Sequence, residues 1–158
     1  MPGRRSAGLI LWRRSGRSFE VLLAHMGGPL WAKRDERAWS IPKGEYDEAE
    51  DPLDAARREF AEELGHPAPP GDLLALGDVR QSGGKTVTAW ALEGDLDASS
   101  IVSNTVTMPW PPRSGRVAEF FEVDRAAWFP PEVARTKLVT AQAAFVDRLE
   151  AALGGARD

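Results

Sequence analysis

Three glutamates, Glu59, Glu62 and Glu63, stand at positions i, i+3 and i+4 of one segment of the chain. If that segment is helical, their side chains share one face, where like charges repel by roughly 0.2–0.5 kcal/mol per pair. A hard divalent cation such as Mg²⁺ would remove this repulsion, because it prefers carboxylate oxygens as ligands. The spacing therefore suggests a metal site, although most charge runs on helices are only solvated faces.

The helix that must position these glutamates begins at Asp51, a good N-cap residue, and has Pro52 at its first position. It ends at Gly65, because a glycine just beyond the last helical residue is a common left-handed stop, and prolines follow it. Phe60 and Leu64 turn to a neighbouring face, which can pack on a sheet while the glutamates face a cleft. One helix would thus pack on the sheet and also provide the ligands for a metal ion.

The rest of the chain predicts mainly strands. Apolar runs bounded by turn residues indicate about five or six strands, at 7–12, 19–25, 38–42, 73–80, 86–92 and 117–123. Segment 130–153 has apolar residues at helical spacing, and segment 97–112 is irregular. Strands, a central helix, more strands and a terminal helix favour an α/β fold with a mixed sheet.

Composition limits the class of protein. The 158 residues suffice for one domain, 1–158, and 42% are hydrophobic, as in ordinary globular chains. The absence of cysteine excludes disulfides and thiolate ligands. A net charge of −4 argues against a non-specific nucleic-acid binder. The apolar stretch near the N-terminus is too short to span a membrane, so we expect a cytoplasmic protein.

The residues around the glutamates form a longer pattern. It consists of Gly44, five residues, Glu50, seven residues, and then Arg58-Glu59-x-x-Glu62-Glu63-x-Gly65. This pattern resembles the Nudix box, the signature of the Nudix hydrolase superfamily, and covers residues 44–66. It departs from the family at His66, where a bulky aliphatic residue is usual, which affects only local packing.

The resemblance implies an α/β/α sandwich and a magnesium-dependent pyrophosphohydrolase, with Mn²⁺ as a substitute ion. Such an enzyme hydrolyses a phosphoanhydride bond in a nucleoside-diphosphate-linked substrate, here an NTP or a dinucleoside polyphosphate. By resemblance the metal ligands are Glu59, Glu62, Glu63 and the carbonyl of Gly44, and the catalytic residues include Arg58, Glu59 and Glu62. Arg58 and Glu50 resemble an orienting pair, and Gly65 has a structural role.

Residues outside the helix bear on the substrate. Lys43 gives a Pro-Lys-Gly variant before the box, similar to that of diadenosine polyphosphate, diphosphoinositol polyphosphate and RNA 5′-end pyrophosphohydrolases. Further candidates for binding a phosphate chain are Lys33, Arg34, Arg113 and Arg116. Family members often supply a distal catalytic glutamate, for which we favour Glu119 over Glu122.

Two alternatives to a nucleotide hydrolase stay open. One is an RNA 5′-end pyrophosphohydrolase, favoured by Lys43 and opposed by the negative net charge. The other is a Nudix-fold module that binds a nucleotide without cleaving it, although such modules commonly lose box carboxylates. We expect a small-molecule nucleotide as the partner, no membrane, no nucleic acid other than an RNA 5′ end, and a homodimer as one option, since relatives are often dimers.

Overall fold

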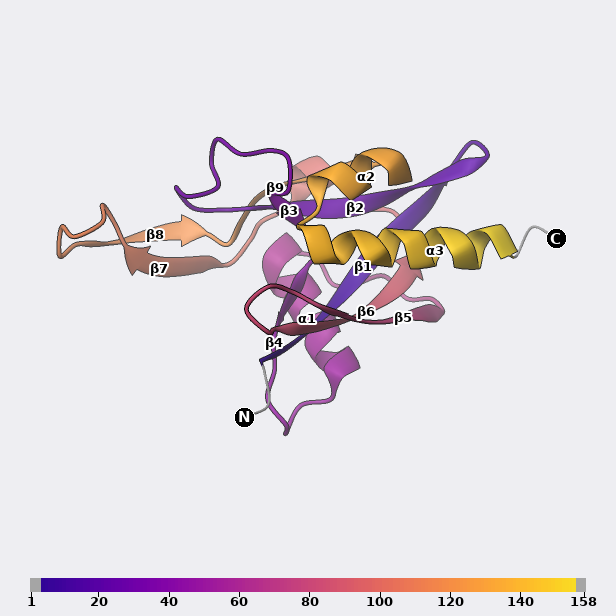
Figure 1. Cartoon of the computed structure of the whole chain (residues 1–158), viewed down its shortest axis with the longest axis horizontal. Helices are drawn as coiled ribbons and strands as arrows, with labels where there is room; N and C mark the ends of the chain where they lie inside the picture. The colour runs from indigo at the N-terminus through magenta and orange to yellow at the C-terminus, as the bar shows by residue number, and fades with distance from the viewer. Residues whose placement is uncertain (1–3, 156–158) are drawn as a thin grey trace.

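A mixed seven-stranded sheet forms the centre of the protein, which we describe from a computed structural model covering residues 4–155 (Figure 1). Its strands are β1 (Arg5–Ser15), β2 (Ser18–Met26), β3 (Trp39–Ser40), β4 (Lys43–Glu45), β5 (Leu73–Arg80), β6 (Thr86–Glu93) and β9 (Val123–Phe129). The order is β3-β2-β1-β6-β5, with β4 paired to β1 and β9 paired to β2. Only β1 and β6 run parallel among these described pairs.

Helices cover both faces of this sheet. They are α1 (Pro52–Leu64), α2 (Pro131–Lys137) and α3 (Ala143–Gly155). Successive residues of β1 point to opposite faces, so Leu9 joins a core with Phe60 of α1, while Ile10 joins a second core with Phe145 of α3. The α/β class and the sandwich are therefore confirmed. None of the described helices is long and apolar enough to cross a membrane.

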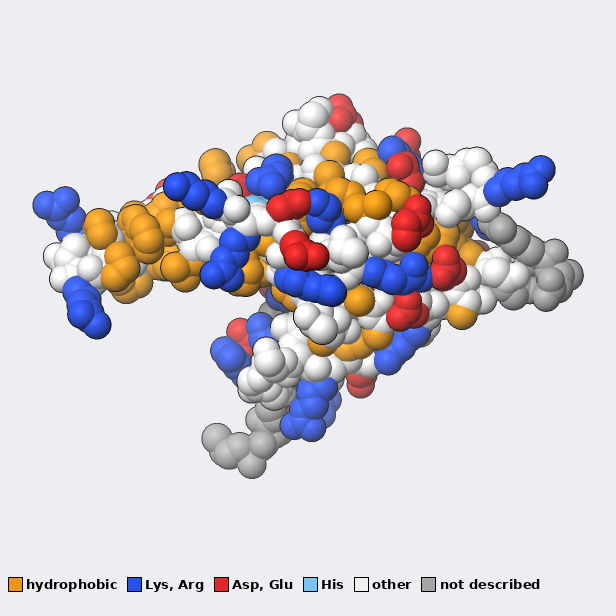
Figure 2. Space-filling view, turned by 45° about the horizontal axis from the view of Figure 1, so that its top comes forward, with side chains coloured by type: hydrophobic (Ala, Val, Ile, Leu, Met, Phe, Trp, Pro, Cys, Tyr) orange, Lys and Arg blue, Asp and Glu red, His pale blue; other side chains and the backbone are white. Residues whose placement is uncertain are grey.

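A hairpin projects from the sheet (Figure 1). It consists of β7 (Thr105–Pro109) and β8 (Val117–Phe121), which pair only with each other among the described strands. Hydrophobic side chains cover it and basic ones stand at its end (Figure 2); Val117 and Phe121 are 72% and 54% exposed. The prediction that 97–112 is irregular was wrong for β7, because β7 has no buried face and so lacks the usual alternation.

The terminal helical pattern also differs from its prediction. It was expected to be continuous over 130–153, but a 3₁₀ turn, η2 (Thr140–Gln142), separates α2 from α3. Leu138 leaves the helix, is fully buried and forms a bridge with Trp39. Val139 donates its backbone N–H to the Trp39 carbonyl at 2.9 Å. Tertiary pairing with β3 thus outweighs the local helical preference.

Gln142 joins η2 to β3, the strand that precedes the box, through hydrogen bonds. Its buried side-chain oxygen accepts hydrogen bonds from the Ile41 N–H at 2.9 Å and the Ser40 hydroxyl at 3.3 Å. Its Nε2 donates to Gln81 Oε1 at 2.9 Å. Gln142 therefore connects η2, β3 with the residue after it, and the β5–β6 turn.

We predict that Gln142→Leu lowers the free energy of unfolding by about 1–3 kcal/mol, because it leaves the buried Ile41 N–H without an acceptor. Urea unfolding followed by circular dichroism measures this. Thr140→Val, at an exposed neighbour, serves as the control and should change stability by less than about 0.5 kcal/mol. Equal stability of the two variants would contradict the structural role of Gln142.

Candidate active site

Helix α1 carries the box glutamates and has the predicted boundaries. The Asp51 carboxylate caps its start by accepting from the N–H groups of Leu53 and Asp54. Gly65 ends it with φ of 74°, in the left-handed region. A side chain at Gly65 would also clash with the Val102 carbonyl, because its Cβ would lie 2.6 Å from that oxygen. Both ends of the helix are thus fixed.

Glu59 lies directly against β4. A Cβ on Gly44 would lie 2.0 Å from Cδ of Glu59, so only glycine permits this approach. Glu59 is 8% exposed, whereas Glu62 lies on the exposed side of the same helix. The structure therefore brings Gly44 and Glu59 together, as the resemblance implies.

Arg58 holds this acidic face together. Its Nε and Nη2 donate to the two carboxylate oxygens of Glu50, each at 2.9 Å. Its Nη1 donates to Glu59 at 2.9 Å and to both oxygens of Glu62 at 3.4 Å. The hydrogen bond from Arg58 lowers the pKa of Glu50. Arg58 and Glu50 thus form the predicted pair, and Arg58 orients two further carboxylates.

Glu63 points from α1 into a cavity of 270 Å³, which Lys43 and Glu122 also line. It is 4% exposed, and its Oε1 accepts from the Lys43 N–H at 3.4 Å. Burial, and then the charge of Glu122, raise the pKa of Glu63 to about 9. Burial and the charge of Glu62 also raise the pKa of Glu59. The positively charged residues around Glu59 and Glu63 therefore do not fully compensate the negative charge of these two carboxylates.

Glu122 is the distal glutamate that the fold brings to this cavity. It lies between β8 and β9, and its Oε2 accepts from Asn104 Nδ2 at 2.8 Å. Its N–H donates to the Asn104 carbonyl, and its own carbonyl accepts from the Gly27 N–H, both at 2.9 Å. The Asn104 N–H donates to the Glu62 carbonyl at 2.9 Å. Asn104 therefore links Glu122 to α1, and no sequence motif identified it.

Glu119, which the sequence analysis favoured, lies elsewhere. It is an exposed residue of β8, opposite Thr107, and lines a different hollow with Gly28 and Pro29. Strand β8 ends at Phe121 and the chain then crosses to β9. Because Glu122 lies at this crossing and Glu119 lies within β8, Glu122 is the glutamate near α1. The apolar run over 117–123 predicts a single strand, so the junction between Phe121 and Val123 has no signal in the local sequence.

The basic candidates separate into two groups. Lys43 lines the cavity with Glu63, and Arg34 lines an adjoining cavity. Lys33 is exposed on the same loop as Arg34. Arg113 and Arg116 stand in the exposed turn that connects β7 to β8, at the end of the projecting hairpin, so the structure does not bring them to the glutamates.

Lys85, in the turn between β5 and β6, is a half-buried cation that the sequence analysis missed. Burial, and then the charge of Lys43, lower its pKa, while Glu45 and Glu122 act in the opposite direction. Lys85 therefore lies within electrostatic reach of Lys43 and Glu122. Its only sequence signal was a lysine after two glycines, which is common in solvated turns.

The donor set fits a hard divalent cation. Within residues 4–155 no three acidic or histidine side chains already form a cluster that could hold a metal ion; Arg58 Nη1 instead contacts Glu59 and Glu62. Yet Glu59 and Glu63 are buried, have raised pKa values and provide only oxygen ligands. Glu59 and Glu63, with Glu62 and the carbonyl of Gly44, would be the residues to hold such a cation.

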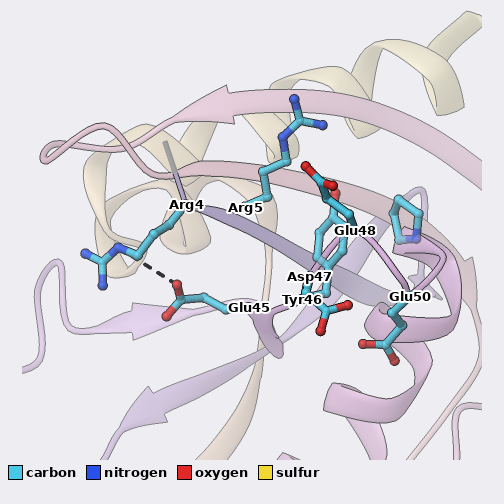
Figure 3. A pocket seen from close by; sticks show the side chains of 8 residues that line it. Arg4, Arg5, Glu45, Tyr46, Asp47, Glu48 and Glu50 are labelled. Atoms are coloured by element: carbon cyan, nitrogen blue, oxygen red, sulfur yellow. Dashed lines mark ion pairs between the residues drawn. The ribbon is translucent and has the colours of Figure 1, made fainter. Parts of the chain in front are cut away.

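A separate hollow of 550 Å³ lies beside the start of β1 (Figure 3). Arg4 and Glu45 form an ion pair across it, 3.8 Å apart, and Glu50 stands at its rim. Glu59, Glu62 and Glu63 are not among its lining residues. We therefore assign the chemistry to the cavity between Glu63 and Glu122.

The raised pKa of Glu63 predicts a pH-dependent stability. A carboxyl whose folded pKa exceeds its unfolded value of about 4.5 stabilises the fold at low pH, and this stability is lost as the pH rises toward about 9. Metal-free protein should therefore melt at a lower temperature at pH 8 than at pH 6. Glu63→Gln should melt higher than the unmodified protein at pH 8, and Mg²⁺ should stabilise only the unmodified protein.

Differential scanning fluorimetry in chelator and in Mg²⁺ measures these melting temperatures. Glu119→Gln is the matched control, because it removes an exposed carboxylate and should follow the unmodified protein. A lower melting temperature for Glu63→Gln than for the unmodified protein, at pH 8 in chelator, would contradict the prediction.

Comparison with known proteins agrees with this geometry. Over 59 residues the chain is 48% identical to an RNA pyrophosphohydrolase of Psychrobacter cryohalolentis, covering 35% of this chain and 34% of the relative. Over 118 residues it is 35% identical to an 8-oxo-(d)GTP phosphatase of Mycolicibacterium smegmatis, covering 66% and 34%. The chain thus spans about a third of the length of these relatives.

The fold has close structural counterparts. A crystal structure of a C. elegans Ap4A hydrolase in a binary complex superposes with a TM-score of 0.64 and 23% identity, covering 96% of this chain and 98% of the other. A family model described as the NUDIX domain matches residues 2–149. The resemblance found in the box is therefore confirmed, and the chain belongs to the NUDIX domain family.

Proposed function

We propose that the protein is a Mg²⁺-dependent hydrolase that cleaves a phosphoanhydride bond in a nucleoside-diphosphate-linked substrate, an NTP or a dinucleoside polyphosphate. The observation that carries this proposal is the pair of opposed carboxylates, Glu63 and Glu122, in one cavity with Lys43. Carboxylates beside a lysine suit a metal ion together with a polyphosphate, because the positive charge of the ion and the negative charge of the phosphates neutralise each other. We expect the enzyme to act in the cytoplasm.

Glu59, Glu62, Glu63 and the Gly44 carbonyl would hold the ion, with Mn²⁺ as a substitute. A bound divalent cation neutralises phosphate oxygens and lowers the pKa of coordinated water. Arg58 keeps Glu59 and Glu62 oriented through its hydrogen bonds. Because Arg58 is itself held by Glu50, it keeps Glu59 and Glu62 in a defined arrangement relative to each other.

Glu122 is our choice for the general base. It would accept a proton from the attacking water while the new P–O bond forms and the anhydride P–O bond breaks, and the electron pair leaves with the departing phosphate. Asn104 holds one oxygen of Glu122, which leaves the other available for the water. Lys43, which lines the cavity, would supply positive charge for the phosphate oxygens, and Lys85 lies within electrostatic reach of Lys43.

A second candidate is hydrolysis at an RNA 5′ end. The similarity to RNA pyrophosphohydrolases and the lysine at position 43 favour it. The net charge of −4 opposes extended contact with an RNA backbone. A binding module without turnover is less favoured, because every box carboxylate is present.

The first test is a product screen with Mg²⁺, using NTPs, oxidised nucleotides, dinucleoside polyphosphates, nucleotide sugars and triphosphorylated RNA. Chromatography of the products would identify the bond that is cleaved. We expect turnover of one nucleotide class, lost in chelator and in Glu63→Gln. Tight Mg²⁺-dependent binding of a nucleotide that stays intact for hours would support the binding module instead.

Glu122→Gln should lower kcat on that substrate by roughly 10²- to 10⁴-fold, the usual contribution of a general base. Glu119→Gln, three residues away and outside the cavity, should stay within about twofold of the unmodified enzyme. Steady-state kinetics on both variants measures the difference. Equal activities would exclude Glu122 as the base.

A further inference from the structure

A second cavity adjoins the active-site cavity. It has a volume of 760 Å³, within the range of about 300–1,000 Å³ that small-molecule sites occupy. Met26 and Trp31 line both cavities, so the two meet at these side chains. The new cavity lies between the loop after β2, the β5–β6 turn and the start of η2, and its lining includes Trp31, Arg34, Glu36, Arg37, Arg80 and Thr140.

Positive charge dominates this lining. Arg34 and Arg80 form no ion pair with any residue in the part of the chain described here. Arg37 is committed to the backbone, since its Nη1 donates to the carbonyls of Arg135 and Leu138. Glu36 is the one carboxylate among the lining residues. Two guanidinium groups are therefore available to an anion.

The backbone on both sides of the cavity is fixed. The carbonyl of Arg34 lies 2.6 Å from Nε2 of the buried His25, whose Nδ1 lies 2.8 Å from Asp124. The Arg34 guanidinium stacks over Trp31, 5.6 Å from the ring centroid. On the other side, Gln142 holds Gln81, the residue after Arg80. Both arginines thus project from supported backbone.

Cations line the cavities on both sides of the junction at Met26 and Trp31. Lys43 lies beside Glu63, and Lys85 lies within electrostatic reach of Lys43. Arg80 is the last residue of β5 and pairs with Thr86, and Lys85 directly precedes Thr86 in the β5–β6 turn. A ligand that extends from one cavity into the other would therefore meet Lys43 in the first cavity and Arg34 and Arg80 in the second.

We propose that this second cavity is a subsite for a phosphate-bearing nucleoside beyond the bond that is cleaved, and that Arg34 and Arg80 bind its phosphate. The proposal rests on the proposed function and specifies its substrate class. Guanidinium groups match phosphate geometry with paired N–H donors. A dinucleoside polyphosphate would occupy both cavities, whereas an NTP would need only the first.

The test compares two ligands in binding experiments on the Glu122→Gln protein, which keeps the proposed metal ligands while its turnover is slowed. Isothermal titration calorimetry with Mg²⁺ measures Kd for diadenosine tetraphosphate and for ATP. Arg34→Gln and Arg80→Gln should each weaken binding of diadenosine tetraphosphate by about tenfold, the loss of one charge-assisted contact, and change ATP binding by less than about twofold. Arg113→Gln and Arg116→Gln, at the hairpin end, are the matched controls and should change neither.

The outcomes separate this proposal from the proposed function. Equal weakening for both ligands, or none, would overturn the subsite even if the enzyme hydrolyses nucleotides. Selective weakening without turnover in the unmodified protein would support the subsite and reject the hydrolase. A short triphosphorylated oligoribonucleotide forms a third arm, and selective weakening there alone would identify the anion as an RNA backbone phosphate and overturn the dinucleotide.

Discussion

The contact between the Glu59 carboxylate and the backbone of Gly44 is the constraint on which the rest of the site depends. It presses α1 against β4 without an intervening side chain, so the ligand-bearing face of the helix meets the end of a strand. The neighbouring face of α1 packs Phe60 and Leu64 into the sheet. Because the apolar side is fixed by close packing, the helix cannot rotate away from β4, and the carboxylates stay crowded.

This crowding has an electrostatic cost that the surrounding residues only partly offset. Arg58 neutralises part of the charge on Glu59 and Glu62, but the buried Glu63 shares a cavity with a second carboxylate, Glu122. Buried like charges favour whatever cation can join them, so the same repulsion that destabilises the metal-free fold supplies affinity for a metal ion. The stability of the metal-free fold and the affinity for a metal ion therefore depend on the same set of carboxylates.

The sequence predicted those parts of the site that depend on local spacing. The helix cap, its glycine stop and the pairing of Arg58 with Glu50 all lie within one short segment, where helix geometry determines the neighbours. It did not locate Asn104 or Lys85, nor did it choose Glu122 over Glu119, because these depend on where distant strands end. The break at Leu138 likewise follows from pairing with Trp39 across the fold, which no local periodicity encodes.

The base of the projecting hairpin lies beside the reaction centre. Glu122 directly follows the last residue of β8, and Asn104 directly precedes the first residue of β7, so the two arms of the hairpin spring from the two residues that share the hydrogen bond beside the reaction centre. An isolated two-stranded ribbon is only marginally stable by itself. The hydrogen bond between Asn104 and Glu122 therefore closes the base of the hairpin, so the position of the ribbon and the orientation of the Glu122 carboxylate are coupled.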